Sequence, residues 1–236
     1  MRGALFAITL SFASLAAADD FNYDPLIDSV ALRYGADRIV FRALVQKESK
    51  KSPWVFNVDG EGFWFSTKDQ AVNALWALTT APWLVKIIPE KDAKPIRRFF
   101  PTERAAQSFA SSYQQSRQMQ GFRALQQRAD DSKEVLDGQF RVRRIWLLNT
   151  DLGIAQISYR FHGKGKGSVQ QWLDPAFNLS YAASHLAELK KQYGSDLQAV
   201  GYYHSKTKRY RDAYMAKFMP IYQKEKARAG IAVAAK

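Results

Sequence analysis

Glu48 is the one carboxylate in the chain that closes an apolar helical stripe. Phe41, Leu44 and Val45 precede it at spacings that place all four residues on one face of a helix. A carboxylic acid held against apolar surface has a raised pKa, so it stays protonated near neutral pH and can act as a general acid. The alternative is that Glu48 lies in a fraying last turn, bent out to water, where neighbouring lysines lower its pKa.

Glu61 is a second carboxylate with a possible chemical role. If it stood across a cleft from Glu48, roughly 6.5 to 9.5 Å away with room for a water molecule, it could act as the base of an inverting glycoside hydrolase. Its Gly-Glu-Gly setting, next to the turn signal Asp59-Gly60, is more typical of a hairpin turn. Asp59 and Asp151 are weaker candidates for such a base.

The sequence lacks the residues or the spacings that other catalytic mechanisms require. The chain has no cysteine, which excludes thiol catalysis and thiolate zinc sites. His162, His185 and His204 do not occur at metal-ligand spacing, and no serine lies in a Gly-x-Ser-x-Gly elbow. The glycine-rich loop 163–167 lacks the following Lys-Ser/Thr of a phosphate-binding loop. We therefore predict neither a metal nor a cofactor.

The helices and strands that must position Glu48 can be predicted from the spacing of apolar residues and from the residues that start and end helices and turns. The sequence predicts a mainly α fold of the α+β class with one small β-hairpin at 52–65. Asp174-Pro175 opens and Gly194 ends the clearest helix. From about 223 onward we expect a loose tail. The other expected helices cover about 24–49, a segment starting at 66–67, 102–128, and a segment starting at 197–203.

The N-terminal segment indicates an exported protein. With 236 residues, of which 47% are hydrophobic, the chain can form one large domain, with or without an insertion. The basic start, the short apolar run and the small residues at 16–18 are typical of a secretory signal, with cleavage expected between Ala18 and Asp19. No later run is long enough to span a bilayer. The net charge of +13 favours anionic partners, and for an exported protein we expect the cell wall rather than nucleic acid.

Four strings in the chain resemble, in order, those of a known family. They are Glu48-Ser49, the segment 153–157 with Gln156, Asn178 with 181–183, and the segment 199–205. These are similar to the Glu-Ser, Gly-Leu-Met-Gln-Ile, Asn…Tyr and Ala-Tyr-Asn-Ala-Gly strings of soluble lytic transglycosylases, lysozyme-like enzymes that cleave bacterial peptidoglycan. The segment 53–62 also resembles an exported bacterial subgroup in which His-Ser replaces Asn-Ala.

The resemblance covers about 24–62 and 150–220, and it implies a domain organisation. A signal peptide at 1–18 would precede a lysozyme-like α+β domain at 19–222, followed by a flexible tail at 223–236. Family members have a short link between the Glu-Ser and Gln strings. The long segment of about 63–148 is therefore expected to be a largely helical insertion, serving as a lid, a substrate wall or a docking element.

The resemblance also assigns roles to individual residues. Glu48 would be the catalytic acid and base. The residues expected to contact substrate are Ser49, Gln156, Asn178, Tyr203, His204 and Glu61. The residues by themselves leave other roles open: Tyr203 could be a core tyrosine, Gln156 a satisfied buried amide, and Asn178 a cap at its helix start. The contacts of His204 stay open because imidazole is bulkier than a carboxamide and titrates near neutral pH.

The implied activity is cleavage of the β-1,4 bond between N-acetylmuramic acid and N-acetylglucosamine, with formation of a 1,6-anhydro sugar. The expected partners are peptidoglycan glycan strands in the periplasm or outside the cell. An envelope-spanning secretion, conjugation or pilus machine is a further expected partner. Two alternatives remain, namely a non-catalytic peptidoglycan-binding scaffold of such a machine and an inverting muramidase that uses Glu61.

Overall fold

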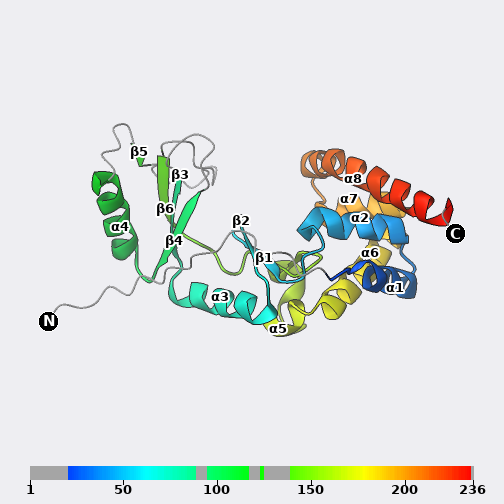
Figure 1. Ribbon diagram of the computed structural model, residues 1–236, viewed down its shortest axis with the longest axis horizontal. Helices are drawn as coiled ribbons and strands as arrows, with labels where there is room; N and C mark the ends of the chain where they lie inside the picture. Colours follow the sequence, from blue (N-terminus) through cyan, green and yellow to red (C-terminus); the bar gives the residue numbers. More distant parts are fainter. Residues whose placement is uncertain (1–20, 89–94, 117–122, 125–138, 235–236) are drawn as a thin grey trace. The chain divides into compact units, whose positions relative to one another are not determined.

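A computed structural model describes residues 21–88, 95–116, 123–124 and 139–234. These residues are mainly helical and carry two small sheets (Figure 1). They fall into two compact units. The sheet unit contains Val58–Gly62 and the described part of Val72–Thr150, and the helical unit contains 21–57, Phe63–Ala71 and 151–234. The predicted signal peptide lies outside the described residues.

The predicted helical block at 24–49 consists of two helices, α1 (Asp24–Tyr34) and α2 (Arg38–Ser49). Gly35 ends α1 in the left-handed conformation, with φ of 71°. The carboxylate of Asp37 then caps α2, because its Oδ1 accepts hydrogen bonds from the backbone N–H groups of Ile39 and Val40, both at 2.8 Å. The chain changes direction at 35–37, between α1 and α2, and α2 then carries Glu48 in its last turn.

The second half of the helical unit contains five helical segments. The prediction for α6 is confirmed: Asp174 accepts a hydrogen bond from the N–H of Phe177 at 3.0 Å at its start, and Gly194 follows its last residue. The helix predicted to start at 197–203 is also present. The segments are η1 (Tyr159–Gly163, a π-helix), α5 (Val169–Trp172), α6 (Pro175–Tyr193), α7 (Asp196–His204) and α8 (Lys208–Ala234).

Helix α8 replaces the loose tail that we expected from about 223. It continues to Ala234 because its inner face is buried: Phe218 and Glu225 are both inaccessible to solvent or nearly so. The carboxylate of Glu225 lies 3.1 Å from the ammonium of Lys51, which also pairs with Asp24. The lysine-rich composition that suggested a tail therefore belongs to the outer face of a packed helix.

The predicted hairpin is confirmed, with its turn at Asp59-Gly60. Both residues have positive φ, 51° and 88°, as a tight hairpin turn of the type I′ kind requires. The hairpin strands belong to a four-stranded sheet in the order β2-β1-β7-β8. Its strands are β1 (Val55–Val58), β2 (Glu61–Trp64), β7 (Thr150–Leu152) and β8 (Ile157–Ser158).

The insertion differs from the largely helical segment that we expected, because it also contains a four-stranded sheet in the order β4-β3-β6-β5. Within the helix predicted at 102–128, the described residues form α4 and a short strand, β5. The strands carry basic residues among large apolar ones, and β6 alternates them, with Arg141 and Arg143 next to Phe140 and Val142. The elements are α3 (Lys68–Thr80), β3 (Trp83–Ile88), β4 (Ile96–Phe100), α4 (Glu103–Ser116), β5 (Arg123–Ala124) and β6 (Gln139–Arg144).

The two faces of this sheet have opposite character. One face packs against α4, with Val85, Ile87 and Phe100 buried beside Ala106 and Ala110. Side chains alternate between faces along a strand, so Lys86 lies on the other face. Lys86 is in register with a cation on each neighbouring strand, Arg97 on β4 and Arg141 on β6. Like charges directly opposite each other destabilise a sheet, so this face needs carboxylates.

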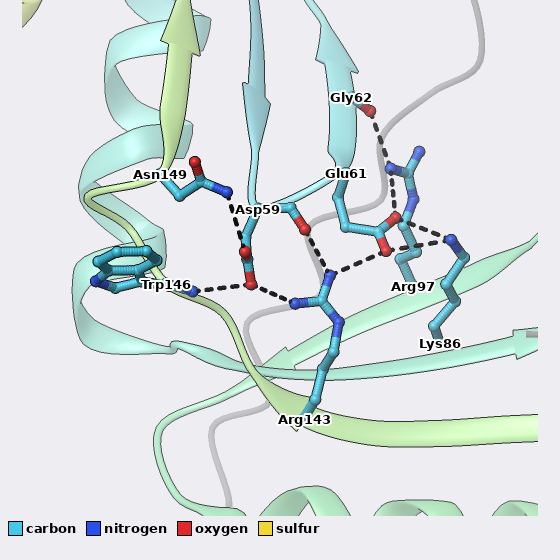
Figure 2. A network of polar contacts seen from close by, with 8 residues as sticks. All are labelled: Asp59, Glu61, Gly62, Lys86, Arg97, Arg143, Trp146 and Asn149. Carbon is cyan, nitrogen blue, oxygen red and sulfur yellow. Dashed lines mark hydrogen bonds and ion pairs between the residues drawn. The ribbon is translucent and has the colours of Figure 1, made fainter. Parts of the chain in front are cut away.

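The hairpin turn supplies these carboxylates (Figure 2). The buried guanidinium of Arg143 donates to Asp59 Oδ2 at 2.6 Å and to Glu61 Oε1 at 3.2 Å. Glu61 also accepts from the ammonium of Lys86 at 3.1 Å, and its other oxygen lies 3.6 Å from Arg97. A buried charge is tolerated only when it is paired, so the turn and the basic face of the sheet stabilise each other.

We expect Arg143→Met to lower the free energy of unfolding by about 3 to 5 kcal/mol, because it leaves the carboxylates of Asp59 and Glu61 buried without their main partner. The exposed neighbour Arg144 provides the matched control, and Arg144→Met should change it by less than about 0.5 kcal/mol. Urea unfolding followed by circular dichroism measures both. Equal effects of the two substitutions would show that the network contributes no net stability.

No helix among the described residues combines the length and the apolarity that crossing a membrane requires.

Candidate active site

Glu48 lies in the last turn of α2, on the stripe that the sequence predicts. Phe41, Leu44 and Val45 are fully buried, and Glu48 itself is half-buried. The helix is regular through Ser49, and only Lys50 leaves it, in the left-handed conformation. Glu48 is therefore fixed at the edge of the core, and the alternative of a frayed, solvated last turn is wrong.

The surroundings of Glu48 raise its pKa above the ordinary value of 4.5. Burial of the carboxyl group is the main cause, because it disfavours the charged form. A hydrogen bond from Tyr214 and the charge of Lys47 act in the opposite direction, and the negative charge of Asp151 raises the pKa further. The net effect favours the protonated acid, which is the form that a general acid needs.

Tyr214 on α8 is the direct partner of Glu48, and sequence reasoning missed it. Its hydroxyl donates a hydrogen bond to Glu48 Oε1 at 2.5 Å, and the residue is only 5% exposed. Burial and the charge of Glu48 raise the pKa of Tyr214 well above 10, so the phenol stays protonated and remains a donor. The four-residue spacing of Tyr210, Tyr214, Phe218 and Tyr222, a helical face, is the signal that could have indicated it.

His204 covers one face of this tyrosine. The two rings are stacked, with centroids 4.2 Å apart and planes 13° from parallel, and the ammonium of Lys47 lies 4.9 Å from the Tyr214 centroid. His204 is an exposed residue, but the burial of its stacked ring and the charge of Lys47 lower its pKa. The predicted contact of His204 with substrate stays a prediction. What the structure adds is that His204 packs on the partner of Glu48.

Tyr203 is a half-buried tyrosine, and its predicted contact with substrate stays a prediction. Burial is the main cause of the raised pKa of Tyr203, and the negative charges of Glu48 and Asp151 raise it further. Its hydroxyl, however, donates to the backbone carbonyl of Ala155 at 2.8 Å. Tyr203 therefore joins α7 to the turn at 153–156.

Asn178 holds the same turn and does not cap its own helix, where Asp174 is the cap. The fully buried amide donates to the carbonyls of Leu152 and Trp172, both at 2.9 Å, and accepts from the N–H of Ala155 at 2.9 Å. All three interactions fix backbone groups that would otherwise be buried without partners. The described contacts of Asn178 are those of a residue that braces the turn.

The turn itself needs Gly153 and Gln156 in left-handed conformations, with φ of 74° and 49°. A Cβ on Gly153 would lie 2.5 Å from both the Asn178 amide nitrogen and the Trp172 carbonyl oxygen, so only glycine fits. The side-chain amide of Gln156 donates to the Gly153 carbonyl at 2.9 Å and to the Val55 carbonyl at 3.4 Å. Gln156 therefore has the satisfied amide that was one of its two predicted roles.

Ser49 and Glu61 have surroundings that disfavour the predicted contact with substrate. Ser49 is buried, and its hydroxyl donates to the Val45 carbonyl of its own helix at 3.3 Å. Glu61 is 3% exposed and belongs to the ion-pair network of the sheet unit. A carboxylate surrounded by Lys86, Arg97 and Arg143 has no open side for an attacking water, which argues against the predicted role of Glu61 as a base.

Asp151 is the second carboxylate that interacts with Glu48. It lies on β7 opposite Ser158 on β8. Burial raises the pKa of Asp151, and a hydrogen bond with Ser158 opposes this effect. Its charge in turn raises the pKa of both Glu48 and Tyr203. The candidate site thus holds two acids with raised pKa values, an arrangement that is common where proton transfer occurs.

Two histidines that the sequence left unassigned lie together in the same unit. The rings of His162 and His185 have centroids 4.7 Å apart, and His162 Nδ1 lies 3.1 Å from the hydroxyl oxygen of Tyr181. The ring of His185 is also 5.7 Å from that of Tyr203. Within the described part of the chain, no three or more His, Cys, Asp or Glu residues form a group that could hold a metal ion.

No family model matches the chain, and no curated protein or solved structure matches it either. The inference of function therefore depends on the residues of the helical unit: a half-buried acid, its phenol partner, a second carboxylate and a braced turn.

We expect Tyr214→Phe to raise the pKa of Glu48 further, because the hydrogen bond that it removes stabilises the ionised carboxylate. A ¹³C NMR titration of the glutamate carboxyl carbons measures the shift, with the Glu48 signal assigned by its loss in Glu48→Gln. The exposed Tyr210 on the same helix is the matched control, and Tyr210→Phe should leave the titration unchanged. A Glu48 pKa that is unchanged or lowered in Tyr214→Phe would contradict the assignment.

The raised pKa of Glu48 also predicts a stability cost. The native state binds this proton more tightly than the unfolded state, so stability falls as the pH rises from the ordinary value of 4.5 through the raised native value. Glu48→Gln removes this loss. It should therefore melt at a higher temperature than the wild-type protein at about pH 8, with the difference vanishing below pH 4.5. Glu103→Gln, at an exposed position of α4, is the control and should show no such trend.

Proposed function

We propose that the protein is a peptidoglycan lytic transglycosylase with Glu48 as its general acid and base. The observation that carries the proposal is the state of Glu48: a half-buried carboxyl group with a raised pKa, held by a phenol that stays protonated. Cleavage of a glycosidic bond needs a proton for the leaving oxygen, and this is the group that can supply it.

The placement of the family-like strings supports the same proposal. Although they are far apart in the sequence, all of them belong to the helical unit. Asn178 and Tyr203 both hydrogen-bond to Ala155, so three of the strings meet at one turn. The negative charge of Glu48, in the remaining string, raises the pKa of Tyr203. These contacts fit a lysozyme-like domain, which we propose as the fold of the helical unit.

The proposed reaction uses Glu48 twice. The protonated acid first transfers its proton to the glycosidic oxygen while the bond to the muramic acid C1 breaks, with assistance from the N-acetyl group of the substrate. The resulting carboxylate then removes the proton of the 6-hydroxyl, and O6 bonds to C1 to give the 1,6-anhydro sugar. The proton returns to Glu48, so no water is consumed and the enzyme is restored.

The neighbours of Glu48 suit the two halves of this cycle. The hydroxyl of Tyr214 donates to the carboxylate that exists between the two proton transfers. The negative charge of Asp151 raises the pKa of the acid and also favours the positive charge that develops on the sugar in the transition state. In this proposal Asp151 acts through its charge only and forms no bond with the sugar.

The proposed setting is the bacterial envelope. The signal-like start of the chain and its net charge of +13 favour export to a compartment with an anionic wall. Glycan strands are the proposed substrate, and an envelope-spanning secretion, conjugation or pilus machine is a proposed partner. A non-catalytic wall-binding scaffold is the competing proposal, and the buried ion pairs of Glu61 argue against an inverting muramidase.

The decisive experiment is digestion of purified sacculi by wild-type protein and by Glu48→Gln, followed by mass analysis of the soluble products. We expect anhydro-muropeptides from the wild-type protein and a loss of about a hundredfold or more in Glu48→Gln, because a positioned general acid contributes at least that much. Glu188→Gln, which removes an exposed carboxylate of the same unit, should retain full activity.

The product identifies the reaction class. Reducing-end muropeptides in place of anhydro products would indicate a hydrolase. Unchanged release by Glu48→Gln would refute the role of Glu48. Wild-type protein that binds sacculi but releases nothing would establish the scaffold.

A further inference from the structure

The sheet unit exposes large apolar side chains on the loop between β6 and β7. Trp146 is 48% exposed and Leu148 is 37% exposed. On helix α3 of the same unit, Trp76 is 58% exposed. Isolated apolar side chains are common on protein surfaces, so exposure alone indicates nothing. What distinguishes this loop is how its backbone is held.

Buried polar groups fix the loop at several points (Figure 2). The backbone N–H of Trp146 donates to Asp59 Oδ2 at 3.2 Å, and the side-chain amide of Asn149 donates to Asp59 Oδ1 at 3.3 Å. The N–H of Ile145 donates to the Pro82 carbonyl at 2.9 Å. The same Asp59 is buried and bonded to Arg143. A loop held in this way presents Trp146 in a fixed orientation, which lowers the entropy cost of binding a ligand.

A recess lies against this loop. Its volume is about 410 Å³, within the range of small-molecule sites, and it is lined by Thr79, Pro82 and residues 144–148. Trp76 precedes Thr79 by three residues, so both lie on one face of α3. Arg144 contributes an exposed guanidinium to the lining. The recess thus combines aromatic surface with one positive charge.

We infer that this recess binds a glycan strand that carries carboxylates, with a sugar ring stacked on Trp146 and a carboxylate paired with Arg144. The inference rests on the proposed function, because it takes the wall polymer as the ligand. A sugar ring offers an apolar C–H face that fits a tryptophan, and arginine pairs with carboxylates through two parallel hydrogen bonds. Muramic acid residues, with their attached peptides, bring both features together.

The size and charge of the recess favour this ligand over a protein partner. A stable protein interface buries at least about 1,000 Å², whereas this recess has room for a small ligand such as one or two sugar rings. The net charge of +13 also favours an anionic polymer. All residues that line the recess belong to the sheet unit. The insertion would therefore bind the cell wall through residues that are not part of the site around Glu48.

The test measures binding of the full chain to purified sacculi by cosedimentation, with Glu48→Gln present in every variant so that the wall stays intact. We expect Trp146→Ala to weaken binding about tenfold, as loss of a buried aromatic anchor does, and Arg144→Gln to weaken it about threefold. Leu32→Ala and Arg33→Gln are the matched controls, since both residues are exposed on α1 and the charge change is the same. Neither control should weaken binding.

Two further measurements separate the outcomes. Unfolding midpoints establish that Trp146→Ala folds, and Trp146→Phe should keep most of the binding because it keeps an aromatic face. With Glu48 restored, turnover of a short soluble glycan should be unchanged by Trp146→Ala. If Trp146→Ala binds sacculi as well as Leu32→Ala does, the inference is overturned. The same holds if Trp146→Ala loses binding to a protein partner but keeps its binding to sacculi. Binding that is lost while the wild-type protein releases no anhydro product supports the glycan site and refutes the proposed activity.

Discussion

The sheet unit depends on the pairing of Arg143 with Asp59 and Glu61. Three cations in register across β4, β3 and β6 would repel one another on a partly buried face, and the nearest carboxylates come from the turn of a distant hairpin. The guanidinium, with donors in a fixed planar fork, reaches both carboxylates at once. The same Asp59 then fixes the backbone of the loop at 145–149. One turn therefore sets the charge balance of a sheet and the shape of a loop.

The helical unit follows the opposite principle at Glu48. Here a carboxyl group is kept in surroundings that disfavour its charge, with one phenol as its hydrogen-bond partner. The remaining polar groups nearby are satisfied, since Asn178 and Gln156 direct their amides to backbone carbonyls of the 152–156 segment. The rigidity of the turn and the chemical readiness of the acid thus come from different residues. Glu48 bears the energetic cost of a buried carboxyl group, and the two amides support the turn.

Several elements of the fold could be predicted from local signals. Asp174 and Gly194 mark the ends of α6, and Asp59-Gly60 marks the hairpin, because caps and tight turns require particular residue types within a few positions. The apolar stripe before Glu48 predicted the buried face of α2, but it left open whether the carboxyl group itself was solvated. These features depend on neighbours in the sequence, so one sequence is enough to indicate them.

The features that were missed depend on partners far along the chain. Tyr214 is 166 positions from Glu48. The aromatic spacing around Tyr214 predicts a helical face, but it does not identify Glu48 as the partner of that face. Glu61 suggested a catalytic base until the structure brought Arg143 to it, 82 positions away. The strands of the insertion carry arginine and lysine among apolar residues. Such basic residues indicate a solvated surface unless a buried counter-charge is known. The sequence alone could not indicate which residues pair across such long separations.

The position of Tyr214 also has a consequence for the timing of assembly. The chain is made from its N-terminus, so Glu48 is present long before α8, whose phenol completes the surroundings of the acid. Until α8 packs, the carboxyl group has neither its donor nor its full burial. A newly made chain therefore completes the surroundings of this acid only after α8 has been synthesised and has packed.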